Sequence, residues 1–213
     1  MIFHSREEAA EQLALRLSTF RGRDPLILAI PRGSVGMGKV LADRLHGDLD
    51  VVLVRKVGAP GNPEFAIGAV TEAGDLIMNE DASYLDISED VVKSLASAEL
   101  LKLRERRAQY TPLITPLDPR GRTVLIVDDG IATGSTMLAA IQSLRARLPR
   151  EIVVCTPVAA RSVVASIAAA ADHLVALHTP DTFMSVGRFY EEFPQVTDEE
   201  VTRILTGSRI RIK

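Results

Sequence analysis

Five short apolar runs recur along this chain, and segments with helical periodicity separate them. The runs are LILAI at 26–30, DVVLV at 50–54, TVLIV at 123–127, EIVVC at 151–155 and HLVAL at 173–177. Strands that are nearly continuously apolar and alternate with helices form a mainly parallel, twisted sheet with helices on both faces. The sequence therefore predicts an α/β fold of this kind.

Helices are expected where apolar residues recur with the helical period. The predicted ranges are 6–19, 35–46, 89–109, 135–148, 161–171 and 198–205. Two weaker strands, 66–73 and 75–80, flank Gly74 and predict a β-hairpin. The chain has 213 residues, 46% of them hydrophobic, which is enough for one domain with a proper core.

The charge and cysteine content indicate which ligands the protein can bind and in which compartment it is found. A net charge of −3 argues against a broad basic surface, so we expect a small ligand and no nucleic acid. The single cysteine, Cys155, makes no intrachain disulfide, and no leader-like or membrane-length apolar stretch is visible. These features predict a cytoplasmic protein without membrane contact. Because Cys155 ends an apolar run, we interpret it as a buried structural thiol rather than a nucleophile.

Charged and small residues follow the predicted strands directly. The first strand leads into PRGS, with Arg32, Gly33 and Ser34, and the second leads into RKVGAPGNPEF, with Arg55 and Lys56. The third leads into DDGIATGST. Ligands of open parallel sheets bind beyond the carboxyl ends of the strands. We therefore expect cations and carboxylates to converge on one rim of the sheet.

The stretch VLIVDDGIATGST at 124–136 carries two adjacent carboxylates, Asp128 and Asp129, before a turn suited to an anion. Two ionised groups at one strand end repel each other and need a ligand, a metal or nearby cations. Both can reach one ligand only if the backbone turns sharply, as Gly130 would permit. The turn precedes a predicted helix, so its N–H groups and hydroxyls can surround a phosphate. An ordinary helix N-cap is the alternative. The turn residues are Ala132, Thr133, Gly134, Ser135 and Thr136.

This stretch resembles the signature of type I phosphoribosyltransferases, which bind phosphoribosyl pyrophosphate. The resemblance implies that Asp128 and Asp129 hold the ribose 2′- and 3′-hydroxyls and that residues 132–136 hold the 5′-phosphate. It also implies magnesium, carried mainly by the substrate rather than by a dedicated protein site, and a homodimer. The fold implied is the α/β fold already predicted, with a helical insertion at 81–119 and a C-terminal hood at 178–197.

PRGS resembles the pyrophosphate loop of the same family, with Arg32 and the backbone around Gly33 as the matching groups. Arg55 and Lys56 open the segment that would form a mobile loop over the substrate, VGAPGNPEF at 57–65. By this resemblance, Asp128 and Asp129 face the positive charge that develops on the ribose, and Arg32 and Lys56 neutralise the departing pyrophosphate. Glu64 is the acid of the loop and is a candidate for proton transfer or metal contact.

The acceptor is less defined. Hypoxanthine–guanine enzymes carry an aspartate where this chain has Ala132, so a 6-oxopurine acceptor is not expected. The segments PRGS, RKVGAPGNPEFAIGAV and TPDTFMSVGRFYEEFPQVTDEEV together resemble a group of predicted bacterial phosphoribosyltransferases without a named acceptor. We expect the acceptor pocket at the exit of the fourth strand and in the C-terminal segment, where an aromatic ring could stack on a base. Its candidate residues are Pro157, Val158, Phe183, Tyr190 and Phe193, and we interpret His178 as structural.

Three functions remain open at this point. The first is an enzyme that transfers phosphoribose to a nitrogenous base. The second is a sensor that keeps the pocket but controls another macromolecule, and the third is an α/β phosphatase with Asp128 as nucleophile. We interpret the charges of KLRERRAQY at 102–110 as a solvated helix face. Replacing both Asp128 and Asp129 by asparagine is expected to leave the fold largely intact.

Overall fold

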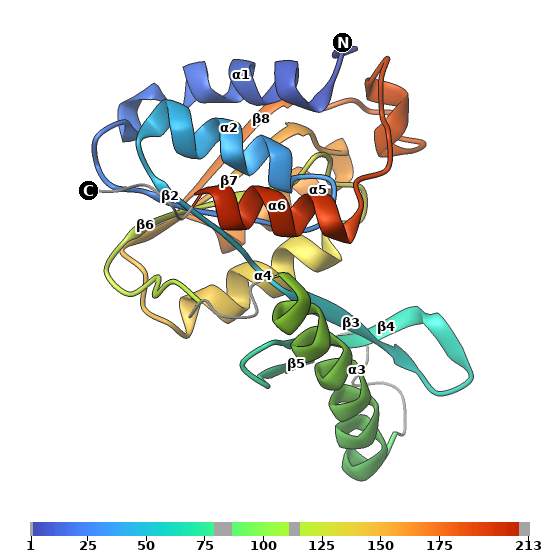
Figure 1. Ribbon diagram of the computed structural model, residues 1–213. Helices are drawn as coiled ribbons and strands as arrows, with labels where there is room; N and C mark the ends of the chain where they lie inside the picture. The colour runs from blue at the N-terminus through green and yellow to red at the C-terminus, as the bar shows by residue number, and fades with distance from the viewer. Residues whose placement is uncertain (1, 79–86, 111–115, 209–213) are drawn as a thin grey trace.

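A five-stranded parallel sheet, in the order β2-β1-β6-β7-β8, forms the centre of the molecule (Figure 1). The computed structural model describes residues 2–78, 87–110 and 116–208. The strands are β1 (Leu26–Ala29), β2 (Asp48–Val51), β6 (Thr123–Val127), β7 (Glu151–Val158) and β8 (His173–His178). The predicted mainly parallel sheet is confirmed, and four of the five apolar runs coincide with its strands. The run at 50–54 does not, because it spans the end of β2 and the first residue of a strand, Val54, in a second sheet.

Helices cover both faces of this sheet. They are α1 (Arg6–Arg16), α2 (Val35–Leu45), α4 (Ser135–Arg145), α5 (Arg161–Ala170) and α6 (Asp198–Ser208), while α3 (Glu89–Tyr110) packs mainly on a second, smaller sheet. Figure 1 shows α1, α2 and α6 on one side of the sheet and α4 on the other. Alternate strand residues supply the two cores, as in β6, where Leu125 packs beneath α1 and α2 while Val124 and Ile126 pack with α4 and α5. Among the described helices, none is both long and apolar enough to cross a membrane.

A second, antiparallel sheet stands beside the main one in the order β3-β4-β5. Its strands are β3 (Val54–Ala59), β4 (Asn62–Thr71) and β5 (Leu76–Met78). The predicted hairpin around Gly74 is confirmed, and Gly74 has a positive φ of 94° that suits the turn. Figure 1 shows this small sheet and α3 projecting together from the main sheet.

The expected loop over 57–65 is wrong, because most of this segment pairs as the β3–β4 hairpin. Glycines and prolines hid the strand pattern. The tight turn lies at Pro60 and Gly61, where Gly61 has a φ of 75°, and a shift of register beside Gly58 absorbs an irregularity in the pairing. The segment that opens with Arg55 and Lys56 is therefore a regular strand pair.

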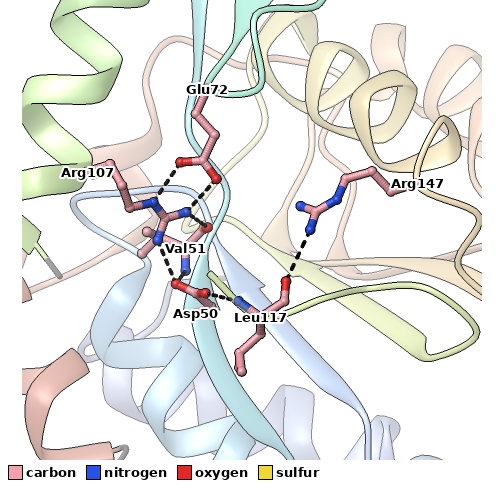
Figure 2. Close-up of polar contacts among 6 residues, drawn as sticks. All are labelled: Asp50, Val51, Glu72, Arg107, Leu117 and Arg147. Carbon is pink, nitrogen blue, oxygen red and sulfur yellow. Dashed lines mark hydrogen bonds and ion pairs between the residues drawn. The ribbon is translucent and has the colours of Figure 1, made fainter. Parts of the chain in front are cut away.

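One buried arginine fastens α3 and the small sheet to the main sheet (Figure 2). Arg107 donates from Nε and Nη2 to the Glu72 carboxylate, at 2.6 and 2.7 Å, and from Nη1 to Asp50 Oδ1 at 2.8 Å. It also donates to the carbonyl of Val51. The Asp50 side chain is 1% exposed and accepts a further hydrogen bond from the backbone N–H of Leu117. The cluster joins β2, the end of β4, α3 and the segment before β6.

The interpretation of residues 102–110 as a solvated face is therefore wrong for Arg107, whose side chain is 13% exposed. Leu103, Arg107 and Tyr110 are spaced by four and three residues and lie on one face of α3. Leu103 and Tyr110 are fully buried, so the residue between them is directed toward the core. The acids that it meets come from segments far away in the sequence, and the helical pattern alone could not reveal them.

Candidate functional site

Two adjacent carboxylates lie where β6 ends, as expected. Asp128 and Asp129 are both half-buried, and Oδ1 of Asp128 accepts a hydrogen bond of 2.9 Å from the backbone N–H of Asp129. Burial, together with the neighbouring charge of Asp129, raises the pKa of Asp128 well above the usual range of an aspartate. No ion pair among the described residues involves Asp128. This carboxylate is therefore poised for a ligand that donates hydrogen bonds or carries positive charge.

Asp129 has a different environment, because its side chain is paired with Arg6. Nε of Arg6 donates to Asp129 Oδ2 at 2.8 Å, and the two side chains are 9% and 15% exposed. The hydroxyl of Tyr190 donates to the Asp129 carbonyl at 2.6 Å. Arg6 was not among the site residues predicted from the sequence. A signal existed, since a cation at the first position of a helix opposes the helix dipole and needs a partner elsewhere.

The PRGS turn, between β1 and α2, lies directly against the acid pair. A Cβ atom on Gly33 would lie 2.1 Å from Asp129 Oδ2, so only glycine admits the carboxylate here. The Arg32 side chain is 43% exposed, and its Nη1 lies 3.4 Å from Asp198 Oδ2 at the start of α6. Ser34 is fully buried, and its hydroxyl donates to the carbonyl of Ile30. The structure thus joins the two predicted loops, with Ser34 stabilising the turn itself.

The turn before α4 presents an open helix N-terminus. Gly134 is the N-cap residue, with a φ of 76°, and no side chain caps the helix through a hydrogen bond. Ala132, Thr133, Ser135 and Thr136 are exposed. The alternative of an ordinary side-chain N-cap therefore does not describe this turn. Its backbone N–H groups and hydroxyls can receive an anion.

Arg55 and Lys56 are neighbours on β3, but they have different surroundings. Arg55 pairs with Glu99 of α3. Lys56 is exposed and, with Ser135 and Thr136, lines a groove of about 500 Å³ between the small sheet and α4. The structure therefore brings both residues to the same groove as the turn before α4, and Arg55 is in addition paired with α3. The side chain of Glu64 lies outside the described part of the chain.

A family model described as a phosphoribosyl transferase domain matches residues 3–175, from the start of the chain to β8. The chain belongs to the phosphoribosyl transferase family. It is 42% identical to TT1426 of Thermus thermophilus, whose crystal structure it matches with a TM-score of 0.88 over 98% of this chain and 99% of that one. A Neisseria gonorrhoeae protein, solved with bound ppGpp, shares the fold at 15% identity, with a TM-score of 0.51 and coverage of 98% and 97%.

Two Mycobacterium tuberculosis proteins, MT0597 and Rv0571c, carry provisional names as phosphoribosyl transferases. Each is 37% identical to this chain over 207 residues, which are 96% of this chain and 46% of the relative. The chain thus spans about half the length of the curated relatives that it matches. The family assignment rests on nearly the whole chain, and it also confirms the α/β fold.

Several residues predicted for the acceptor pocket fill the core of the protein instead. Pro157 and Val158 are buried within β7, which runs three residues further than predicted. Tyr190 is 6% exposed, and its ring stacks on Phe193 with centroids 5.0 Å apart. Phe183 is half-buried and packs against another phenylalanine of the C-terminal segment. The prediction is therefore corrected for Pro157, Val158 and Tyr190, which do not face an open pocket.

Two residues interpreted as structural keep that role in the structure. Cys155 lies fully buried in β7, where burial raises the pKa of its thiol. The interpretation as an unreactive buried thiol is confirmed. His178 packs edge-on against Phe189, with ring centroids 5.9 Å apart, and burial lowers its pKa.

Gly130 follows the acid pair and permits close packing rather than a positive φ. A Cβ atom at this position would lie 2.5 Å from Cγ1 of Val186, in the 3₁₀ helix η3 (Val186–Phe189), and 3.1 Å from Cγ1 of Val158. The backbone does bend at Asp129, as predicted, and Gly130 provides the space in which the backbone of the acid pair meets the C-terminal segment.

Gly130→Ala is expected to lower the free energy of unfolding by about 1–3 kcal/mol, since the added methyl overpacks this contact. Gly36→Ala is the matched control, because its Cβ would meet nothing closer than Oε1 of Glu7 at 3.8 Å and it lies within α2. That control should be neutral or slightly stabilising. Urea denaturation of both variants measures the difference. Equal stability of the two variants would contradict close packing at Gly130.

Proposed function

We propose that this chain transfers phosphoribose from phosphoribosyl pyrophosphate to a nitrogenous base other than a 6-oxopurine. The observation that carries the proposal is the adjacency of three features: Asp128 without a described ion-pair partner, the open turn before α4 and the PRGS turn against Asp129. A sugar diol fits the carboxylate, and a phosphate fits the helix N-terminus. Each charge-assisted hydrogen bond contributes about 1.5–3 kcal/mol.

In the proposed reaction, the base displaces pyrophosphate from the anomeric carbon through a transition state with oxocarbenium character. Asp128 stabilises the positive charge on the ribose, and its position at a strand end preorganises that interaction. Arg32, half-exposed beside Gly33, offers a cation to the pyrophosphate, and Lys56 offers another from the groove beside α4. The methyl group of Ala132 offers no hydrogen bond to a purine ring, which supports the exclusion of 6-oxopurines.

Magnesium is proposed to arrive with the pyrophosphate, where it would supply charge neutralisation of the leaving group. The donor set fits this assignment. Asp129 already accepts from Arg6, which leaves fewer carboxylate oxygens of the acid pair for a directly bound metal. The role of the chain is therefore to bind and orient the sugar and to hold the two phosphate ends apart.

A regulatory protein that binds phosphoribosyl pyrophosphate or a nucleotide without turnover is the second candidate. It is favoured by the burial of Pro157, Val158 and Tyr190, which leaves the predicted acceptor pocket without these three members. Binding of the ligand would then bias a protein partner rather than precede transfer. The curated relatives are about twice as long as this chain. A protein partner of this chain could resemble the part of those relatives that this chain does not match.

The test uses the purified chain with phosphoribosyl pyrophosphate, magnesium chloride and a panel of purine, pyrimidine and other nitrogenous bases. Release of pyrophosphate that depends on one base is expected for the enzyme. Thermal stabilisation by phosphoribosyl pyrophosphate without release from any base would instead support the regulatory protein. Neither stabilisation nor release would refute both. Where the charge of Asp128 is removed by Asp128→Asn, the control is Asp90→Asn, which removes the same charge from the exposed first turn of α3.

A further inference from the structure

A buried guanidinium lies behind the acid pair, contributed by Arg6 at the first position of α1. The residue is 8% exposed. Its Nε donates to Asp129 Oδ2 at 2.8 Å, and its Nη1 donates to the carbonyl of Pro194 at 2.7 Å. The face of the guanidinium lies 3.7 Å from the ring centroid of Phe193. Arg6 therefore binds the end of β6 and the C-terminal segment at once.

The position of Arg6 is costly without a specific role. A cation at a helix N-terminus opposes the helix dipole, and burial removes its hydration. An apolar side chain would fill the same space between α1 and Phe193 without either cost. The hydrogen bond to Asp129 therefore explains why this position is occupied by an arginine.

The carboxylate of Asp129 is constrained on two sides. Oδ2 accepts from Arg6 and occupies the space that a Cβ atom on Gly33 would need, while the carbonyl oxygen of the same residue accepts from Tyr190. No hydrogen bond among the described residues reaches Oδ1. One oxygen is thus held by the protein, and the other remains available to a ligand beside Asp128.

We propose that Arg6 is a positioning residue of the ribose site, which orients Asp129 so that Oδ1 accepts from a ribose hydroxyl. The inference rests on the proposed function, because it assumes that the acid pair holds a sugar diol. It goes further by making the two acids unequal: Asp128 is oriented by a backbone N–H, and Asp129 by a buried cation. The planar guanidinium is needed, since it donates to two acceptors and stacks on Phe193.

The test measures the affinity for phosphoribosyl pyrophosphate with magnesium chloride by titration calorimetry, in the wild type, Arg6→Met and Arg6→Lys. Arg6→Met is expected to weaken binding at least 10-fold. Arg6→Lys keeps the charge but loses the planar fork, and should recover only part of the affinity. Arg16→Met, at the exposed far end of α1, is the matched control and should bind like the wild type.

A double variant separates positioning from folding. Arg6→Met with Asp129→Asn removes both members of the buried pair, so it should melt above Arg6→Met alone. The difference in melting temperature gives the effect of the unpaired carboxylate on folding, and the affinity of folded Arg6→Met gives the effect on its orientation. If pyrophosphate release is measurable, Arg6→Met should raise KM for phosphoribosyl pyrophosphate more than it lowers kcat.

The outcomes separate this inference from the proposed function. Wild-type affinity in folded Arg6→Met would overturn the positioning role and leave the transfer reaction standing. Binding that depends on Arg6, without pyrophosphate release from any base, would support the positioning role and refute the transfer reaction. Absence of binding by the wild-type chain would overturn the ribose site and this inference with it.

Discussion

Replacing Asp128 with asparagine is expected to raise the melting temperature of the protein while removing its turnover. Burial and the charge of Asp129 raise the pKa of Asp128 in the folded state, so the ionised carboxylate destabilises the fold at neutral pH. The contribution of the Asp128 side chain to stability is fully present below its unfolded-state pKa, where the carboxyl is protonated. This contribution is lost as the pH rises through the raised folded-state pKa. Asparagine does not ionise, and its amide oxygen can still accept from the N–H of Asp129.

We expect Asp128→Asn to melt about 2–4 °C above the wild type at pH 8, the change that about 1 kcal/mol produces in a chain of this size. The difference should shrink as the pH falls through the raised pKa toward the ordinary range of aspartate. Differential scanning calorimetry across this range measures it. A melting temperature below that of the wild type at every pH would contradict the raised pKa.

The same variant should lose about 100-fold or more in kcat/KM for phosphoribosyl pyrophosphate, because the carboxylate no longer faces the positive charge on the ribose. Asp129→Asn is the informative comparison. It leaves Arg6 buried without its carboxylate, so it should be less stable than the wild type by about 3–5 kcal/mol. The contact with Arg6 changes the expectation that the fold stays largely intact when both acids are replaced: we now expect this for Asp128→Asn and a loss of stability for Asp129→Asn. Full activity in Asp128→Asn would contradict its assigned role.

Arg107→Met is expected to lower the free energy of unfolding by about 3–5 kcal/mol, the usual effect of breaking a buried ion pair. Asp50, 1% exposed, would lose the cation that neutralises it, and Glu72 would lose two hydrogen bonds. At about 2–4 °C for each kcal/mol, the melting temperature should fall by roughly 10 °C. Chemical denaturation gives the free energy directly.

Arg104→Met is the matched control for this prediction, since Arg104 lies one turn earlier on α3 and is exposed. Its effect should stay within about 0.5 kcal/mol. A loss below about 1 kcal/mol in Arg107→Met would show that α3 and the small sheet do not depend on the cluster of Figure 2. If Arg107→Met lowers the stability by more than this, we also expect the position of Lys56 to change. Lys56 lies on β3, which pairs with β4, and Glu72 directly follows β4.

The main sheet was predictable because its signal is local. Apolar runs such as TVLIV at 123–127 are bounded by polar residues, and the helices between them have clear periods, so β6 and α4 begin where predicted. The hairpin of β3 and β4 was hidden, because Gly58, Pro60 and Gly61 suggest a long loop, whereas only Pro60 and Gly61 form the turn and the residues on either side pair as strands.

The candidate site could be predicted only where it is contiguous in sequence. Asp128, Asp129 and the turn that follows form one motif, and the structure keeps them together at the end of β6. Arg6 is separated from Asp129 by 123 residues, and no local pattern joins them. The burial of Tyr190 likewise depends on Phe3 and Phe193, so an aromatic residue that suggested base stacking serves the core instead.

The most direct test of the central claim is a crystal structure of this chain with phosphoribosyl pyrophosphate and magnesium. We predict the 5′-phosphate at the backbone N–H groups of 133–136, the ribose hydroxyls on Asp128 and Asp129, and the pyrophosphate beside Arg32 and Gly33. A donor bound elsewhere, with the turn before α4 unfilled and both carboxylates directed away from the sugar, would contradict the account.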